Sequence, residues 1–183
     1  MSSIDHRPYW KDGFTFERYL DEEVEEHEDL WAGVYRKHST PEWALERLEE
    51  VGGQWRLIAI TEDWCGDASN TVPVVARLAE DSPRVDFRVV SRDDNPELMD
   101  QYLTDGSRSI PVVVILDDDF EPVGHWGPRP QELQEFVISE KAKGERPVDE
   151  IYRDTRKWYA RDRGETTLDE LLEKIEAAAH VSA

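Results

Sequence analysis

Residues 57–68 read Leu-Ile-Ala-Ile-Thr-Glu-Asp-Trp-Cys-Gly-Asp-Ala, and this stretch decides the fold. Residues 57–61 form a short apolar run that is long enough for a buried strand and too short for a helix. Cys65 follows where this strand ends and a helix begins, so its thiol meets unpaired N–H groups and partial positive charge, which favour thiolate. Asp67 opposes this effect, because a neighbouring negative charge raises a thiol pKa. From the helix position we expect a Cys65 pKa below the free-thiol value of about 8.5, and a buried, inert cysteine is the alternative.

The pattern after Cys65 predicts alternating helices and strands. Apolar runs at residues 85–90, 112–116 and 122–126 predict three further strands, and helical periodicity separates the first two of these from each other and from the strand at 57–61. A last helix from about residue 130 to 141 closes the unit. A right-handed crossover makes the first two strands parallel, and the short acidic turn at 117–119 makes the last two antiparallel.

Helices are also predicted on both sides of this unit. Apolar residues recur at three- and four-residue steps over residues 16–34, and a second helix is expected before Gly52. Two more follow in the tail, one over 148–159 and one after Gly164, where Thr167 and Glu170 form a capping box. We expect the tail helices to cover their own core. The predicted division is a helical N-terminal extension at 1–54, a central domain at 55–142, and a C-terminal helical extension at 143–183 packed on the same domain.

The composition is strongly acidic, with 42 Asp and Glu against 22 Lys and Arg among 183 residues, for a formal net charge of −20. Such a charge argues against binding nucleic acids or anionic membranes. It fits either adaptation to high salt or an ordinary acidic bacterial protein. The first six residues are polar and lead into no apolar stretch, no run of about 18 apolar residues occurs, and one cysteine cannot form an internal disulfide. These features predict a cytoplasmic protein.

Residues 55–141 resemble the thioredoxin superfamily. Trp64-Cys65-Gly66 matches the opening of the thioredoxin active site, and Pro73 matches the proline that kinks the active-site helix. Ile110-Pro111 is similar to the loop whose cis-proline faces the cysteine. The resemblance implies an α/β thioredoxin-like fold, with a central mixed sheet flanked by helices and with helical N- and C-terminal extensions.

A closer resemblance is to a bacterial thioredoxin-like family whose active site reads Trp-Cys-Gly-Asp followed by Cys or Ala. The stretches that carry it are residues 61–68, 92–103, 109–111 and 126–129. The resemblance implies that Cys65 is the catalytic residue. It also implies a set of residues lining the site: Trp64, Gly66, Asp67, Ala68, Ile110 and Pro111.

Two arginines are candidates for a position near this site. Arg108, three residues before the proline, is a candidate for stabilising the thiolate, with a surface arginine paired to a carboxylate as the alternative. Arg129 is interpreted as part of a turn that leads into the last helix. The five His residues show no metal-ligand spacing, and we expect no metal and no cofactor.

The sequence departs from ordinary thioredoxin at three positions. Ala68 stands where the resolving cysteine belongs, so Cys65 can form a mixed disulfide and has no internal thiol to release it. Ala59 replaces a buried Asp of that family, and Thr61 replaces a Trp. General dithiol reduction is therefore not expected.

Three functions remain open from the sequence. The first is monothiol thiol–disulfide exchange, in which protein disulfides or low-molecular-weight thiols are the partners. The second is a redox-inert module that binds an extended peptide or partner in the same groove. The third is a dimer linked through Cys65. The expected state is a monomer or homodimer, with neither nucleic acid nor membrane as a partner.

Overall fold

A four-stranded sheet in the order β2-β1-β3-β4 lies at the centre of the computed structural model, which describes residues 4–182. The strands are β1 (Trp55–Thr61), β2 (Val85–Ser91), β3 (Val112–Leu116) and β4 (Pro122–Trp126). β1 and β2 are parallel, whereas β3 is antiparallel to both β1 and β4. The predicted mixed sheet is confirmed, as are the parallel first pair and the antiparallel last pair.

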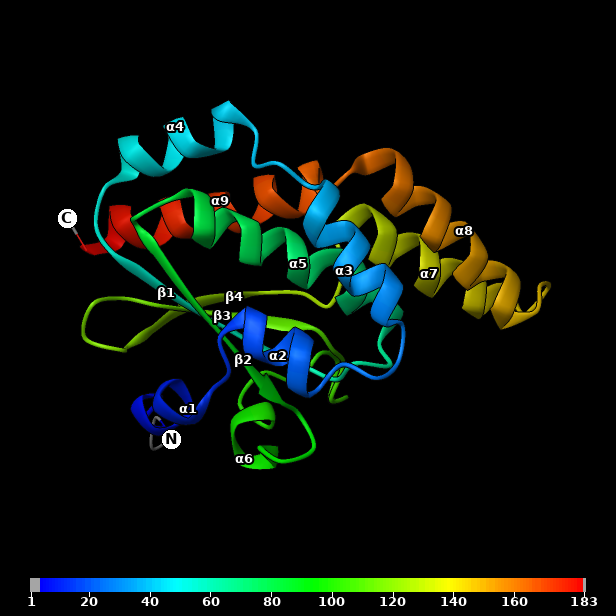
Figure 1. The fold of residues 1–183 in the computed structure, drawn as a ribbon. Coiled ribbons are helices and arrows are strands. Elements are labelled where there is room, and N and C mark those ends of the chain that lie inside the picture. The colour runs from blue at the N-terminus through cyan, green and yellow to red at the C-terminus, as the bar shows by residue number, and fades with distance from the viewer. Residues whose placement is uncertain (1–3, 183) are drawn as a thin grey trace.

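Two long helices cover one face of this sheet (Figure 1). They are α5 (Gly66–Asp81), which follows the Cys65 motif, and α9 (Glu165–Ser182) at the end of the chain. They contact each other, and α3 (Glu28–Lys37) and α4 (Glu42–Val51) pack against α5 and α9 respectively. The short helices α1 (Arg7–Asp12) and α6 (Pro96–Met99) lie toward the other face (Figure 1). The flanking helices thus surround a sheet whose strands β1 and β3 are almost entirely buried.

The single helix predicted over residues 16–34 is two helices, α2 (Phe16–Glu22) and α3. The chain turns between them at His27, which has a left-handed φ of 58°. The Asp63 carboxylate accepts hydrogen bonds from the backbone N–H groups of Glu25 and Glu26, at 2.9 and 2.8 Å. In a continuous helix these N–H groups would bond to main-chain carbonyls. The Asp63 side chain, next to the Cys65 motif, takes the place of those carbonyls and stabilises the break between α2 and α3.

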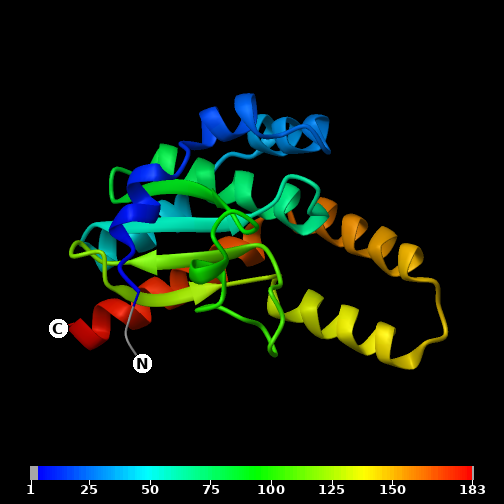
Figure 2. The same ribbon diagram turned by 90° about the horizontal axis from the view of Figure 1, so that it is seen from below.

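The helix predicted to close the unit forms part of a projecting hairpin. α7 (Gln131–Lys143) forms an antiparallel hairpin with α8 (Val148–Asp162), and this hairpin projects from the body (Figure 2). α9 lies against β4 instead. Leu168, Leu171, Leu172 and Ile175 on α9 are fully or almost fully buried in the core.

Glu170 anchors α9 in this position. Its carboxylate accepts hydrogen bonds from the indole N–H of Trp126 at the end of β4 and from the backbone N–H of Gln131 at the start of α7, both at 2.7 Å. α9 begins at Glu165, so Thr167 lies inside the helix and the predicted capping box with Glu170 is not formed.

Among residues 4–182, no helix combines the length and the apolar character that crossing a bilayer requires.

Gly127 fixes how the loop after β4 lies against the loop before β3. Its φ is +119°, and an added Cβ would come within 2.2 Å of the Pro111 carbonyl oxygen. Gly127→Ala should therefore lower the free energy of unfolding in urea by about 3 kcal/mol, since both backbone strain and overlap oppose it.

Gly144→Ala is the matched control, because Gly144 also has a positive φ, +62°, and no atom of residues 4–182 lies within 4 Å of an added Cβ. This substitution should cost only the backbone term, about 1 kcal/mol. Equal losses for the two variants would contradict the close approach at Pro111.

Candidate functional site

Cys65 lies at the junction between β1 and α5, as the residue that caps the helix N-terminus. Its Sγ accepts a hydrogen bond from the backbone N–H of Ala68 at 3.4 Å, and its thiol donates to the carbonyl of Ile110, also at 3.4 Å. The Ile110–Pro111 peptide bond is cis, as the resemblance implied. The fold therefore brings the loop before β3 directly against the thiol.

Burial dominates the chemistry of the Cys65 thiol. The residue is 7% exposed, and loss of solvation raises its pKa to about 11, with the Asp67 charge adding to the increase. The N–H groups of Ala68 and Asp67 and the Arg129 guanidinium act in the opposite direction. The expectation of a low pKa is wrong, because the helix N-terminus stabilises the thiolate less than desolvation destabilises it.

Asp67 sits at the centre of a buried polar cluster next to the thiol. One carboxylate oxygen accepts a hydrogen bond from the Tyr159 hydroxyl at 2.8 Å, and the other forms an ion pair with Arg129 at 2.7 Å. The side chains of Asp67 and Arg129 are only 12% and 14% exposed. Arg129 also donates to the amide oxygen of Gln134 at 2.7 Å. Burial and the neighbouring carboxylate hold the pKa of Tyr159 well above its ordinary value, so the phenol stays a donor.

The sequence did not assign Arg129 and Tyr159 to the site. The sequence predicts a turn at Arg129, and it predicts Tyr159 on the apolar face of a tail helix, 92 residues from Asp67. No local periodicity links these positions, because the contacts form only when α8 packs back onto the start of α5. The one available signal was the stretch at 126–129, which carries part of the family resemblance.

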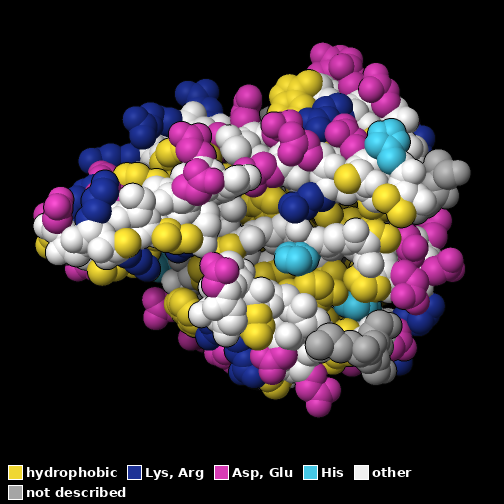
Figure 3. Space-filling model, turned by 180° about the vertical axis from the view of Figure 1, so that it is seen from behind, with side chains coloured by type: hydrophobic (Ala, Val, Ile, Leu, Met, Phe, Trp, Pro, Cys, Tyr) yellow, Lys and Arg dark blue, Asp and Glu magenta, His cyan; other side chains and the backbone are white. Residues whose placement is uncertain are grey.

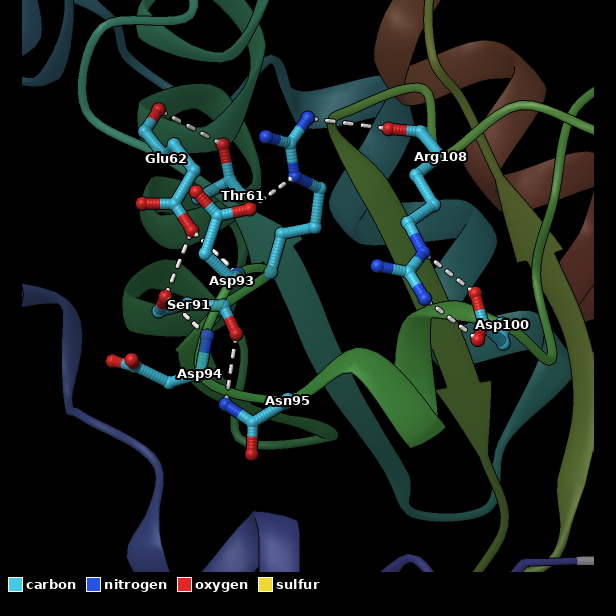
Figure 4. A network of polar contacts seen from close by, with 9 residues as sticks. Thr61, Glu62, Ser91, Asp93, Asp94, Asn95, Asp100 and Arg108 are labelled. Carbon is cyan, nitrogen blue, oxygen red and sulfur yellow. Dashed lines mark hydrogen bonds and ion pairs between the residues drawn. The ribbon is translucent and has the colours of Figure 1, made fainter.

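Arg108 is paired with the Asp100 carboxylate (Figure 4). Its guanidinium forms a bidentate ion pair with Asp100, at 2.7 and 2.8 Å, and its side chain is 50% exposed. Its backbone carbonyl accepts a hydrogen bond from Arg92 at 3.3 Å. The cation that lowers the Cys65 pKa is therefore Arg129, and Arg108 takes the alternative role of an arginine paired to a carboxylate.

A cavity of about 560 Å³ opens over the thiol. Trp64, Cys65, Gly66, Asp67 and Ile110 form part of its wall, whereas Ala68 and Pro111 are buried behind it. Trp64 is 48% exposed, and the Arg92 guanidinium lies 5.2 Å from the centre of its indole ring. The opposite wall comes from α3 and from the α7–α8 hairpin. The part of the chain that the structure describes contains no group of three or more His, Cys, Asp or Glu placed to hold a metal ion.

The family model described as thioredoxin matches residues 13–143. The chain belongs to the thioredoxin family. A thioredoxin H-type from Fagopyrum esculentum is 32% identical over 104 residues, which cover 56% of this chain and 86% of that protein.

Two solved structures share the fold over nearly the whole chain. A protein of unknown function from Pseudomonas aeruginosa matches with a TM-score of 0.73 and 20% identity, covering 96% of this chain and 99% of that one. An HIV epitope scaffold matches with a TM-score of 0.74 and 19% identity, covering 95% and 99%. This form of the thioredoxin fold therefore includes flanking helices like those outside residues 13–143.

The Asp67–Arg129 pair gives a test of the buried cluster. Arg129→Met leaves the carboxylate with Tyr159 alone, so the variant should lose about 3 kcal/mol of unfolding free energy in urea. It should also raise the pKa of Cys65, because the cation that lowers that pKa is gone.

The double variant Asp67→Asn, Arg129→Met removes the stranded charge and should recover part of the lost stability. An Arg129→Met single variant as stable as wild type would show that the carboxylate does not depend on this cation.

Proposed function

We propose that this protein carries out thiol–disulfide exchange with Cys65 as its single reacting thiol. The observation that carries the proposal is that Cys65 lines the cavity and that its Sγ accepts a hydrogen bond from the backbone N–H of Ala68 at the start of α5. Protein disulfides and low-molecular-weight thiols are the proposed partners, and the cytoplasm is the compartment that suits a lone cysteine.

The exchange takes place in two steps. The Cys65 thiol loses its proton, and Sγ attacks one sulfur of a bound disulfide. A bond forms between Sγ and that sulfur, the original S–S bond breaks, and the departing thiolate takes up a proton. A low-molecular-weight thiol from solution then attacks the mixed disulfide, which releases Cys65 and forms a new disulfide. The external thiol is required because Ala68 supplies no second sulfur.

Reaction in the free protein should be slow at neutral pH. A pKa of about 11 leaves a thiolate fraction on the order of 10⁻⁴ at pH 7. Exchange therefore depends on the cavity holding a disulfide against Sγ, since fixed proximity and orientation offset a low thiolate fraction.

A redox-inert binding module is the second candidate function. The 7% exposure of Cys65 and its raised pKa favour this role. In that case the half-exposed Trp64 and the Ile110–Pro111 loop would hold a partner, and the thiol would take no part.

The pH dependence of alkylation tests the state of the thiol. Because burial raises the Cys65 pKa to about 11, the rate of iodoacetamide modification should rise about tenfold per pH unit from pH 7 to 10. It should reach no plateau in that range. A plateau below pH 8.5 would mean that the thiolate is already stabilised in the free protein.

Ala68→Cys tests the role of the missing resolving thiol. Wild type treated with 2-hydroxyethyl disulfide should accumulate a mixed disulfide at Cys65 that is visible by intact mass, and it should reduce insulin negligibly. Ala68→Cys should convert that adduct to an internal disulfide, because the new thiol would lie beside Sγ. Cys65→Ser is the control for adducts elsewhere. A wild-type protein that never forms the adduct, even at pH 9, would favour the redox-inert role.

A further inference from the structure

The cavity over Cys65 is basic in a protein that is otherwise strongly acidic. Five cationic side chains line it: Arg92, Arg108, Arg129, Lys141 and Arg156. Asp67 is the only acidic residue that the described chain contributes to the wall, and Tyr159 and Arg129 already occupy its two oxygens. The whole chain carries a net charge of −20, so a concentration of cations at this place requires an explanation.

The α7–α8 hairpin supplies the cations that no carboxylate neutralises. The Lys141 ammonium donates a hydrogen bond to the Tyr152 hydroxyl at 2.7 Å and lies 4.8 Å from the centre of that ring. The Arg156 side chain has neither an ion pair nor a hydrogen bond to any residue from 4 to 182. Arg92 and Arg108, by contrast, each pair with an aspartate on the body.

The hairpin as a whole differs in charge from the body. Residues 131–163 contain eight of the 22 Lys and Arg residues and an equal number of Asp and Glu, so they are neutral. The rest of the chain carries the full negative charge. In Figure 3, Lys and Arg side chains gather on the projecting arm, and acidic side chains are spread over the body.

Size and chemistry narrow the class of ligand. A volume of about 560 Å³ is that of a small-molecule site. Leu30, Trp64 and Ile110 add apolar surface to the cavity wall, which suits a short aliphatic stem. An acidic protein would be repelled by the body over its whole surface, whereas a small anion inside the cavity responds mainly to charges within a Debye length of about 10 Å.

We propose that this cavity binds a low-molecular-weight thiol or disulfide that carries at least two anionic groups, such as carboxylates, with its sulfur directed to Cys65. Arg156 and Lys141 bind one anionic group at the hairpin, and the cations of the body bind the other. The direction of the ligand's sulfur to Cys65 rests on the proposed exchange, whereas the binding of its anionic groups by the cavity does not.

Octanedioate is a probe for the binding of two anionic groups in the cavity, because it has the length and charges of the disulfide 3,3′-dithiodipropionate and contains no sulfur. Calorimetric titration of the wild-type protein at low ionic strength should show binding of octanedioate and none of octane-1,8-diol or octane-1,8-diamine. Arg156→Gln should weaken octanedioate binding about two- to fivefold.

Arg153→Gln is the matched control, since it removes the same charge from α8 at a position that does not line the cavity. It should leave the affinity for octanedioate unchanged. The proposal is overturned if octanedioate does not bind, if the diamine binds better, or if Arg153→Gln weakens binding as much as Arg156→Gln.

Mixed-disulfide formation at Cys65 separates this proposal from the proposed function. Dianionic 3,3′-dithiodipropionate should react faster than neutral 2-hydroxyethyl disulfide, and dicationic cystamine should be slowest, although the net charge alone would favour cystamine. Binding of octanedioate without any adduct would support the anion site and overturn exchange. Adducts formed fastest with cystamine, without octanedioate binding, would support exchange and overturn the anion site.

Discussion

The rest of the site depends on the pairing of the Asp67 carboxylate with Arg129 and Tyr159. A buried charge must be paired and hydrogen-bonded, and the two partners of Asp67 come from the loop after β4 and from α8. This requirement fixes the base of the projecting hairpin against the first turn of α5. The hairpin can therefore form one wall of the cavity over Cys65, and it carries Lys141 and Arg156 to that cavity.

The same packing accounts for the character of the thiol. A helix N-terminus favours thiolate, yet the surrounding elements bury Cys65 and direct the Ile110 carbonyl toward its hydrogen. A carbonyl accepts from a thiol and has nothing to donate to a thiolate, so it adds to the preference for the neutral form. With Ala68 in place of a second cysteine, the site depends on a bound partner to make its single sulfur reactive.

Much of the fold was predictable because local patterns carry it. The run at 57–61, the strands that follow and the turn at 117–119 each leave a short-range signal, and the sheet agrees with them. The break between α2 and α3 had no such signal, since the Asp63 carboxylate that holds it lies far along the chain. That the tail helix α9, and not α7, lies against β4 also had no local signal, because both helices are amphipathic and the hydrogen bond from Trp126 to the Glu170 carboxylate favours α9.

The sequence by itself determined the thioredoxin-like fold, the place of Cys65 at a strand–helix junction and the absence of a resolving thiol at Ala68. Those features depend on residue identity and spacing along the chain. Only the tertiary structure decided that Arg129 and not Arg108 acts on the thiol, that Cys65 is buried with a raised pKa, and that cations gather around it. Charge–charge interactions and desolvation depend on distances and burial in space. Residues as far apart in the chain as Asp67 and Tyr159 come together only after the chain has packed.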